Sequence, residues 1–166
     1  SIVLSHTYRQ SGNAERGSRN RDPENRLFGR ANRRRLDAES IRDAILSTSG
    51  RLSDDHAGPM FPPSLAADYG FKHTAACRSV YLPVFRNALP ELFEAFDFAD
   101  PSTVTGRRNA STVAPQALFM MNNPWVIDQA KHAAERLLAE HHSTEDARIV
   151  RAYRLALGRM PTAGEC

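Results

Sequence analysis

The residues whose types and spacing could support chemistry lie in a stretch, residues 78–118, that is also rich in phenylalanine. Asp97 and Asp100 are separated by two residues, so after a helix end their carboxylates could point toward a common side and one could serve as a general base. The arginines of this stretch could bind an anionic group such as a sulfate, a phosphate or a uronate: Arg78, Arg86, Arg107 and Arg108. The pattern therefore gives two catalytic candidates and a four-residue anion-binding set.

The same polar residues, together with Asn87 and Gln116, have a second interpretation as a buried network of ion pairs and caps. Such a network would hold the loop between residues 96 and 118 in place. Removing one partner would leave a buried charge unpaired, which costs about 3–5 kcal/mol. We favour this structural interpretation. The two interpretations differ in whether the charged side chains line an open cleft or contact one another.

A second basic cluster runs from Arg30 to Arg35 and precedes a predicted helix. Clustered arginines can hold phosphates, which makes nucleic-acid binding an alternative function. However, acidic residues are interleaved with the cluster, and no aromatic stacking set accompanies it. The net charge of the whole chain is only +3, although 20 of its 22 basic residues are arginine. We therefore expect a solvated or salt-bridged surface here rather than a nucleic-acid partner.

His56 and His73 lie near three aspartates and are the only candidates for metal ligands: the aspartates are Asp54, Asp55 and Asp68. No two histidines have i, i+4 spacing and no compact ligand set occurs, so no metal site is predicted. The two cysteines, Cys77 and Cys166, have no metal-binding spacing and form no Cys-x-x-Cys-His haem motif. No cofactor is expected in this segment, and no nucleophile elbow supports a hydrolase.

Helical periodicity dominates the elements that must position these residues. Apolar residues recur at three- and four-residue spacing in segments that predict helices over residues 34–48, 89–96 (or from 87), 114–121, 124–140 and 144–157. A short helix over 23–29 and a helix end over 2–8 are also predicted. Residues 52–76 follow neither period and predict a long, partly disordered excursion. The predicted fold is mainly α, an irregular helical bundle with long loops and at most a short extended or edge-strand segment.

The aromatic stretch is predicted to form the core of this bundle. Leu89, Leu92, Phe93 and Phe96 make a helical stripe, and an extended segment over 78–85 places Val80, Leu82 and Val84 on one side. Helix 34–48 is expected to pack through one apolar face, which holds Ala38, Ile41, Ala44, Ile45 and Thr48. Its other faces would carry Glu39, Arg42 and Asp43.

Length and composition favour a single domain. A chain of 166 residues with 41% apolar content can build one core, and no apolar run approaches the roughly 20 residues of a membrane-spanning helix. The first residues resemble the end of a helix, and Thr162 and Glu165 have the spacing of a capping box for a helix that would follow Cys166. We therefore expect a piece of a longer multidomain protein.

Several motifs, in order along nearly the whole chain, resemble one family. They include Asn32-Arg-Arg-Arg-Leu-Asp-Ala-Glu-Ser-Ile-Arg-Asp-Ala44, Arg78-Ser-Val-Tyr-Leu-Pro-Val84, Phe96-Asp-Phe-Ala-Asp-Pro-Ser102, Pro115-Gln-Ala-Leu118 and Arg154-Leu-Ala-Leu-Gly-Arg159. The family that these motifs resemble is the planctomycete domain of unknown function, found near the C-terminus of large proteins that often also carry a cytochrome c domain. The resemblance implies a helical module of an exported, extracytoplasmic bacterial protein, with any haem attached elsewhere. It supplies no activity and no catalytic residues.

Three functions remain open from the sequence. We favour a non-catalytic interaction or scaffold module whose partners are other domains of the same polypeptide. The alternatives are an enzyme domain, or part of one, acting on a sulfated or acidic polysaccharide, and nucleic-acid binding through Arg30 to Arg35. A complete catalytic constellation is not visible, so whether the chain is an enzyme is left undecided.

Overall fold

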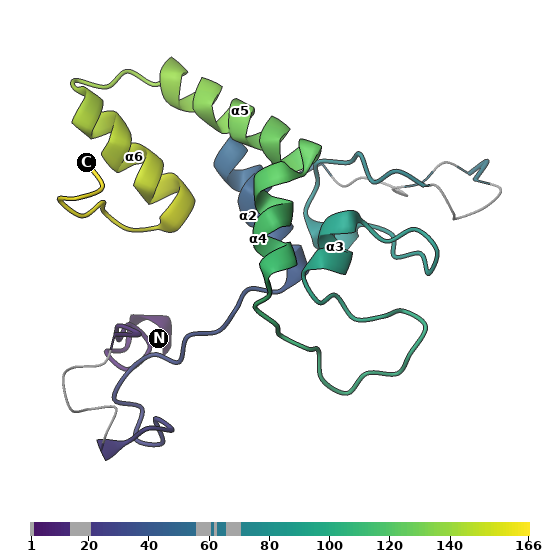
Figure 1. Cartoon of the computed structure of the whole chain (residues 1–166), viewed down its shortest axis with the longest axis horizontal. Helices are drawn as coiled ribbons and strands as arrows, with labels where there is room; N and C mark the ends of the chain where they lie inside the picture. The colour runs from purple at the N-terminus through teal and green to yellow at the C-terminus, as the bar shows by residue number, and fades with distance from the viewer. Residues whose placement is uncertain (1, 14–20, 56–60, 62, 66–70) are drawn as a thin grey trace. The chain divides into compact units, whose positions relative to one another are not determined.

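The computed structural model describes residues 2–13, 21–55, 61, 63–65 and 71–166 (Figure 1). It divides into two compact units, residues 1–35 and residues 36–166. Among the described residues of the first unit, Ile2–Leu4 form the 3-10 helix η1. The second unit holds the α-helices and, with them, the apolar core.

The first unit corrects the prediction of a helix over residues 23–29. Asn25 and Phe28 both have positive φ, at 54° and 53°, which is incompatible with a right-handed helix. The carboxylate of Asp22 accepts the backbone N–H groups of Arg26 and Leu27, each at 2.9 Å. These bonds, that of Leu27 foremost, lower the pKa of Asp22. A short polar side chain that bonds nearby amides favours such a loop over a helix.

The second unit is mainly α, as predicted. Five α-helices occur among the described residues: α2 (Ala38–Ser49), α3 (Glu91–Ala95), α4 (Ala114–Asn122), α5 (Pro124–Ala139) and α6 (Glu145–Leu157). The same described part has no strand, only two isolated β-bridges, which join Ser53 to Cys77 and Phe85 to Ala88. A 3-10 helix, η2 (Ser79–Tyr81), lies in the segment predicted to be extended.

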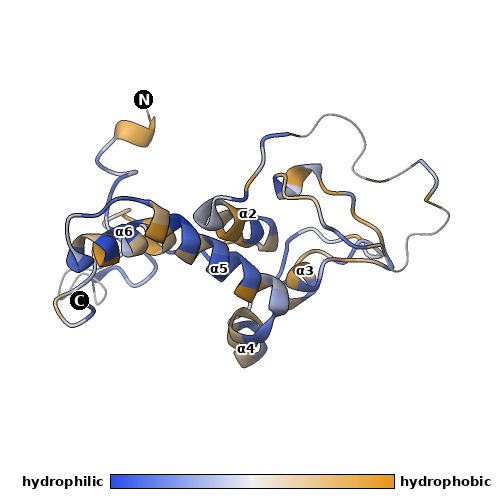
Figure 2. Ribbon diagram, turned by 90° about the horizontal axis from the view of Figure 1, so that it is seen from above, coloured by the Kyte–Doolittle hydropathy of each residue, from blue (hydrophilic) through white to orange (hydrophobic). Residues whose placement is uncertain are grey.

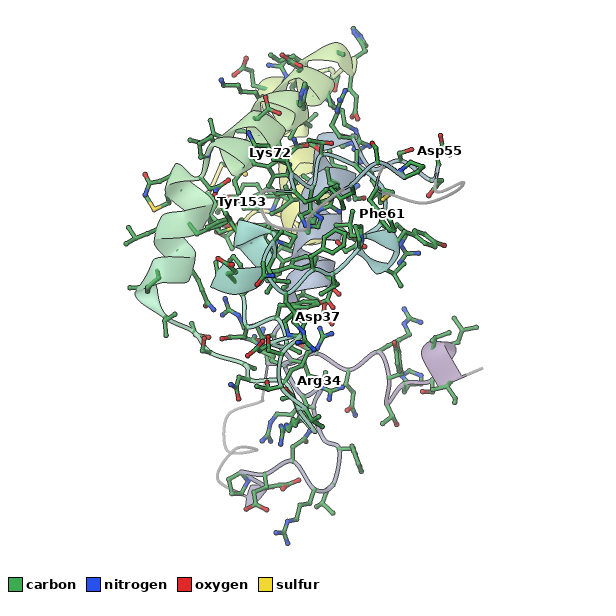
Figure 3. All side chains as sticks on the ribbon, turned by 90° about the vertical axis from the view of Figure 1, so that its right-hand side faces the viewer. Arg34, Asp37, Asp55, Phe61, Lys72 and Tyr153 are labelled. Carbon is green, nitrogen blue, oxygen red and sulfur yellow. The ribbon has the colours of Figure 1, made fainter. Side chains whose placement is uncertain are left out.

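Helix α2 begins and ends where its capping residues require. Asp37, at the N-terminal end of α2 (Figure 3), accepts the N–H of Ser40 at 2.8 Å. Gly50 ends the helix in the left-handed conformation with φ 75°. The buried face differs from the predicted one, because Arg42, Leu46 and Ser49 are buried whereas Ala44 is exposed. The prediction that Arg42 lies on a polar face is therefore wrong.

The aromatic stretch contributes most of the core, as the sequence predicted. The buried apolar residues of the core are Ala38, Cys77, Leu82, Leu92, Phe93 and Phe96. Phe93 stacks on Phe98 with ring centroids 4.7 Å apart, and Phe96 meets Phe119 of α4 edge to face at 6.0 Å. Aromatic pairs in these geometries add to the burial of their rings, by about 0.5–1.5 kcal/mol. The stretch thus joins α2, α3 and α4.

The predicted alternation over residues 78–85 is wrong. Leu82 is buried, but Val80 is 75% exposed and Val84 is exposed as well. The cause is the 3-10 turn at Ser79–Tyr81, closed by the Leu82 N–H donating to the Ser79 carbonyl at 3.1 Å. A 3-10 turn rotates successive side chains by about a third of a circle instead of a half.

Helices α5 and α6 have side-chain N-caps and little buried surface. Asn123 caps α5, Thr144 caps α6, and Gly158 ends α6 in the left-handed conformation. In α5 only Val126 and Gln129 are buried, and α6 has no buried residue. Beyond α6, Glu165 accepts the N–H of Thr162 at 2.8 Å, which is half of the predicted capping box. No helix in the described part of the chain is long and apolar enough to cross a membrane.

Candidate functional site

Arg42 makes the most extensive polar contacts in the core of the second unit. Its guanidinium donates to the Cys77 carbonyl at 2.9 Å, to the Ser79 hydroxyl at 3.2 Å, and also to the Ala75 carbonyl. Burial lowers its pKa, and the neighbouring Asp43 partly offsets this effect. Arg42 is only 5% exposed, so its guanidinium is not accessible to a ligand. Its hydrogen bonds instead hold residues 75–79 against α2.

Asp43 completes this connection. Its Oδ1 accepts both the N–H and the hydroxyl of Ser79, at 2.8 and 2.6 Å. Arg42 lies 3.8 Å from the same carboxylate. Arg78, predicted for anion binding, approaches it at 3.9 Å with an exposed side chain. The Arg-Asp pair in α2 therefore satisfies the buried polar groups of η2.

The predicted catalytic aspartates are engaged in loop structure. Asp97 has φ 57°, and one of its oxygens accepts both the N–H and the hydroxyl of Ser111 at 2.7 Å. The buried Gln116 extends this contact, because its amide donates to the Ser111 hydroxyl at 3.2 Å. Asp100 is exposed and accepts the N–H of Ser102 at 2.8 Å. The two carboxylates thus bind separate turns of the loop.

The remaining predicted arginines lie at the surface. Arg108 donates to both carboxylate oxygens of Glu39 at 2.7 Å, and its guanidinium stacks over the Phe98 ring at 4.9 Å. Arg86 and Arg107 are exposed. The structure thus brings Arg108 to α2 and Arg78 near Asp43, and neither arginine contacts the two aspartates in the bonds described here.

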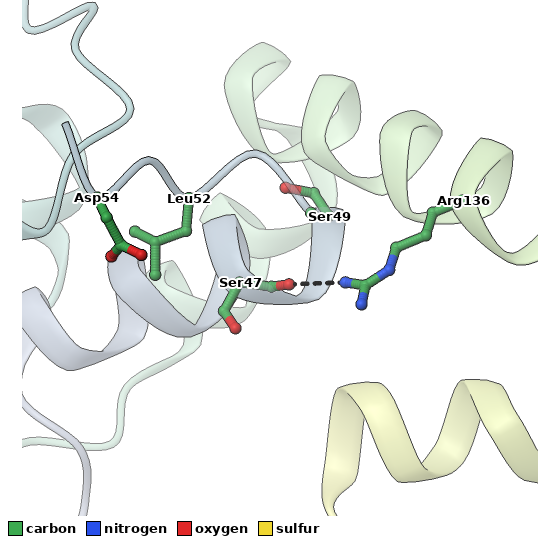
Figure 4. A pocket seen from close by; sticks show the side chains of 6 residues that line it. Ser47, Ser49, Leu52, Asp54 and Arg136 are labelled. Carbon is green, nitrogen blue, oxygen red and sulfur yellow. Dashed lines mark hydrogen bonds between the residues drawn. The ribbon is translucent and has the colours of Figure 1, made fainter.

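A polar hollow of about 550 Å³ lies beside the C-terminal end of α2 (Figure 4). Arg136 reaches it from α5 and donates to the carbonyls of Ser47 and Thr48, at 3.0 and 3.2 Å. Ser49 and Gln129 hydrogen bond beside it at 2.9 Å. Arg136 thus satisfies the free carbonyls at the end of α2, where a cation is favoured by the helix dipole.

A second hollow, which we name the aromatic cleft, has a volume of about 360 Å³. Its lining includes Phe71, His73, Glu91, Phe119, Asn123 and Trp125. Asn123 donates to Glu91 at 2.8 Å and so connects the start of α5 to α3. His73 Nε2 lies 2.8 Å from the Ala88 carbonyl, whereas its Nδ1 is buried without a hydrogen-bond partner among the described residues. Among the hollows described here, this one combines aromatic walls with unused polar atoms.

The metal candidates and the basic cluster are placed as follows. His56 and Asp68 lie outside the described residues, and within the described part no group of three or more His, Cys, Asp or Glu side chains could hold a metal ion. In the first unit, Arg30 donates to the carbonyls of Asp22 and Pro23 at 2.9 and 2.7 Å. Arg33 donates to the Asn13 side chain. Both arginines therefore stabilise loops of their own unit.

A family model described as PSD1, a protein of unknown function (DUF1553), matches residues 1–166. The chain belongs to this family. No curated protein and no solved structure matches it. The predicted relationship to a domain of unknown function is confirmed, whereas the planctomycete source, the cytochrome c association and the exported location stay predictions.

Two features of the second unit were not predicted from the sequence: the buried Arg42 and the aromatic cleft. Arg42 follows Ala38 by four residues and precedes Leu46 by four, so it lies in line with buried positions of α2. This spacing was the available signal. The aromatic cleft has no comparable signal, because Phe71, Glu91 and Trp125 are far apart in the sequence and meet only through the packing of α3 and α5.

Proposed function

We propose that the chain is a helical interaction module that docks onto another domain of the same polypeptide through one face of α4. The observation that carries this proposal is an apolar stripe in that helix. Its four residues are Ala114, Ala117, Leu118 and Met121, and all are exposed. We name it the α4 stripe.

The spacing of the α4 stripe is that of a packing surface. Positions i, i+3, i+4 and i+7 form one continuous face of a helix, which in a surface helix normally turns toward the core. Here the core-facing residues are Gln116 and Phe119. Leu118 is 57% exposed and Met121 is 72% exposed. The second unit therefore covers the face of α4 that holds Gln116 and Phe119, and the apolar stripe stays exposed.

The composition of α4 favours a protein partner. The helix contains no charged residue, and Figure 2 shows its apolar residues in orange. Burying a leucine or methionine side chain contributes about 1.5–3 kcal/mol, and an exposed stripe of this spacing can anchor in a groove of a partner. A membrane surface is less suited, because interfacial helices carry lysine or arginine on their polar face. The absence of charge in α4 supports a protein-packing role instead.

Hydrogen exchange tests the proposal. Amide exchange over residues 114–122 is compared between the isolated residues 1–166 and the natural full-length polypeptide. We expect slower exchange in the full-length polypeptide, because docking stabilises α4 against local opening. The substitution Leu118→Glu should remove this added protection, because a charge in an apolar interface lacks a partner.

Leu157→Glu is the matched control, because Leu157 in α6 is 58% exposed and Leu118 is 57% exposed. It should leave the protection of α4 unchanged. Equal exchange in the two polypeptides would contradict the proposal. The proposal would also be contradicted if residues 1–166 formed a concentration-dependent dimer in sedimentation velocity and Leu118→Glu abolished it. The stripe would then bind a second copy of the chain.

The alternative of an enzyme acting on an anionic polysaccharide stays a prediction, as does nucleic-acid binding. No observation favours either over docking. Asp97 is occupied by Ser111, and Arg108 by Glu39. Arg30 is engaged with backbone carbonyls of its own unit. A charge that already has close partners gains less from a new ligand, because the existing bonds must be broken first.

A further inference from the structure

We propose that the aromatic cleft binds a neutral sugar residue. This site is separate from the proposed docking surface, since none of the four residues of the α4 stripe lines the cleft. Its volume of about 360 Å³ is at the lower end of the roughly 300–1,000 Å³ typical of ligand sites. A space of this size fits one or two sugar rings.

The walls of the cleft suit the apolar faces of such a ring. Phe71 lies on one side with its ring edge-on to His73, their centroids 4.9 Å apart. Phe119 and Trp125 line the cleft from α4 and α5. Aromatic rings offer a large contact area with few rotatable bonds, and ligand sites typically combine them with a few polar groups. The C–H groups of a pyranose ring provide a matching flat apolar surface.

His73 supplies an acceptor. The Ala88 carbonyl can only accept a hydrogen bond, so Nε2, 2.8 Å away, carries the proton in the neutral ring and Nδ1 keeps a lone pair. Nδ1 is buried and has no hydrogen-bond partner among the described residues. Buried polar atoms are nearly always satisfied, so one that is not points to a missing donor. A ligand hydroxyl is such a donor.

Glu91 and Trp125 supply a further acceptor and a donor. Glu91 uses one carboxylate oxygen to accept from Asn123, and because the residue is exposed its other oxygen can accept from a ligand. Trp125 engages its backbone N–H with the Asn123 side chain, and its indole N–H is a further donor on a residue that lines the cleft. The cleft therefore offers both acceptors and a donor.

Hydroxyl groups match this combination, because each one can donate and accept. An anion is disfavoured, since Glu91 would repel it and the guanidinium of Arg42 is engaged with the Ala75 and Cys77 carbonyls. A cationic amine could pair with Glu91 but would leave the indole N–H of Trp125 unused, and the exposed Lys72 also lines the cleft. The observations thus favour a neutral polyhydroxylated ring over either ion.

The chain carries a built-in reporter, because Trp125 is its only tryptophan. Residues 1–166 are titrated with cellotriose, mannotriose and chitotriose while tryptophan emission is followed, and the affinities are measured by calorimetry. We expect at least one trisaccharide to bind in the millimolar range or tighter and to shift the emission to shorter wavelength. Failure of all three to bind would overturn the proposal. So would equal or tighter binding of glucuronate or cadaverine.

Two pairs of variants locate the binding. His73→Phe keeps a ring but removes the acceptor, and we expect roughly tenfold weaker binding, the effect of one hydrogen bond. Its control is His132→Phe in α5, a residue that does not line the cleft, and this variant should bind as the wild type does. Glu91→Ala should weaken binding severalfold, whereas Glu94→Ala, exposed on the same short helix, should not. The glutamate pair decides the question if His73→Phe fails to fold, and equal affinities within both pairs would contradict the assignment.

Discussion

Arg42 illustrates how one charged residue can hold a segment that has no regular structure. Residues 75–79 form no strand, and the carbonyls of Ala75 and Cys77 accept hydrogen bonds from a side chain instead. The planar guanidinium of Arg42 reaches three acceptors in different directions, on Ala75, Cys77 and Ser79. An arginine is suited to this role because it presents five N–H donors in a fixed plane and stays charged when buried.

Replacing Arg42 by methionine should therefore destabilise the second unit strongly. Methionine fills a similar volume but leaves two buried carbonyls and the Ser79–Asp43 pair without their cation. We expect a loss of about 3 kcal/mol in the free energy of unfolding, at the lower end of the range for breaking a buried charge pair. Urea denaturation measures the change. Arg107→Met, at an exposed position, is the control and should alter stability by less than about 0.5 kcal/mol.

At the scale of single residues, the sequence predicted local bonds better than distant ones. The caps Asn123 and Gly158 bond backbone groups within a few positions of themselves, so local residue types indicate where α5 begins and α6 ends. The partners of Arg42 lie more than 30 residues away, at Ala75 and Cys77. Helical periodicity says which face a residue occupies only when polar residues avoid the core, and Arg42 does not. This is why its burial was missed.

The elements show the same division between local and distant causes. The long helices α4, α5 and α6 match their predicted ranges within a few residues, because period and caps agree. The helix over residues 23–29 did not form, since Asp22 and Asn25 bond the backbone of a loop instead. The short α3 begins after Pro90, later than predicted. Short segments with competing polar side chains are decided by such bonds rather than by period.

The ends of α2 and α6 allow a matched comparison of two glycines. Gly50 and Gly158 both have positive φ, 75° and 65°. Alanine at either position should cost about 1 kcal/mol, because the left-handed conformation crowds its Cβ against the backbone. At Gly50 the added Cβ would also come within 3.3 Å of the Arg136 side chain, whereas at Gly158 nothing lies within 4 Å.

We therefore expect Gly50→Ala to destabilise the second unit more than Gly158→Ala does. The added Cβ requires the Arg136 side chain to shift, which strains its hydrogen bonds to the carbonyls of Ser47 and Thr48. Denaturant unfolding of the two variants measures the difference. Adding Arg136→Met to each glycine variant should abolish the difference in stability between them. A larger loss for Gly158→Ala would show that crowding by Arg136 is unimportant.

On the scale of the whole molecule, the sequence predicted where the core lies but not how little of each helix it covers. Leu92, Phe93 and Phe96 are buried as their spacing indicated. The same kind of stripe in α6 buries nothing, and Leu138 of α5 is 67% exposed. An apolar stripe indicates that a helix has a face to bury, but not whether its partner belongs to the same unit. The docking proposal rests on that difference.

The division into two units makes a prediction about independence. Every buried hydrophobic residue among those described belongs to residues 36–166, whereas the buried residue of the first unit is the polar Asn25. Since apolar burial is the main favourable term in folding, residues 36–166 should fold without residues 1–35. We expect the thermal midpoint of residues 36–166 to match that of residues 1–166, with the helical circular dichroism retained. A fall of more than about 4 °C, equivalent to about 1 kcal/mol in a domain of this size, would instead support the single domain predicted from the sequence.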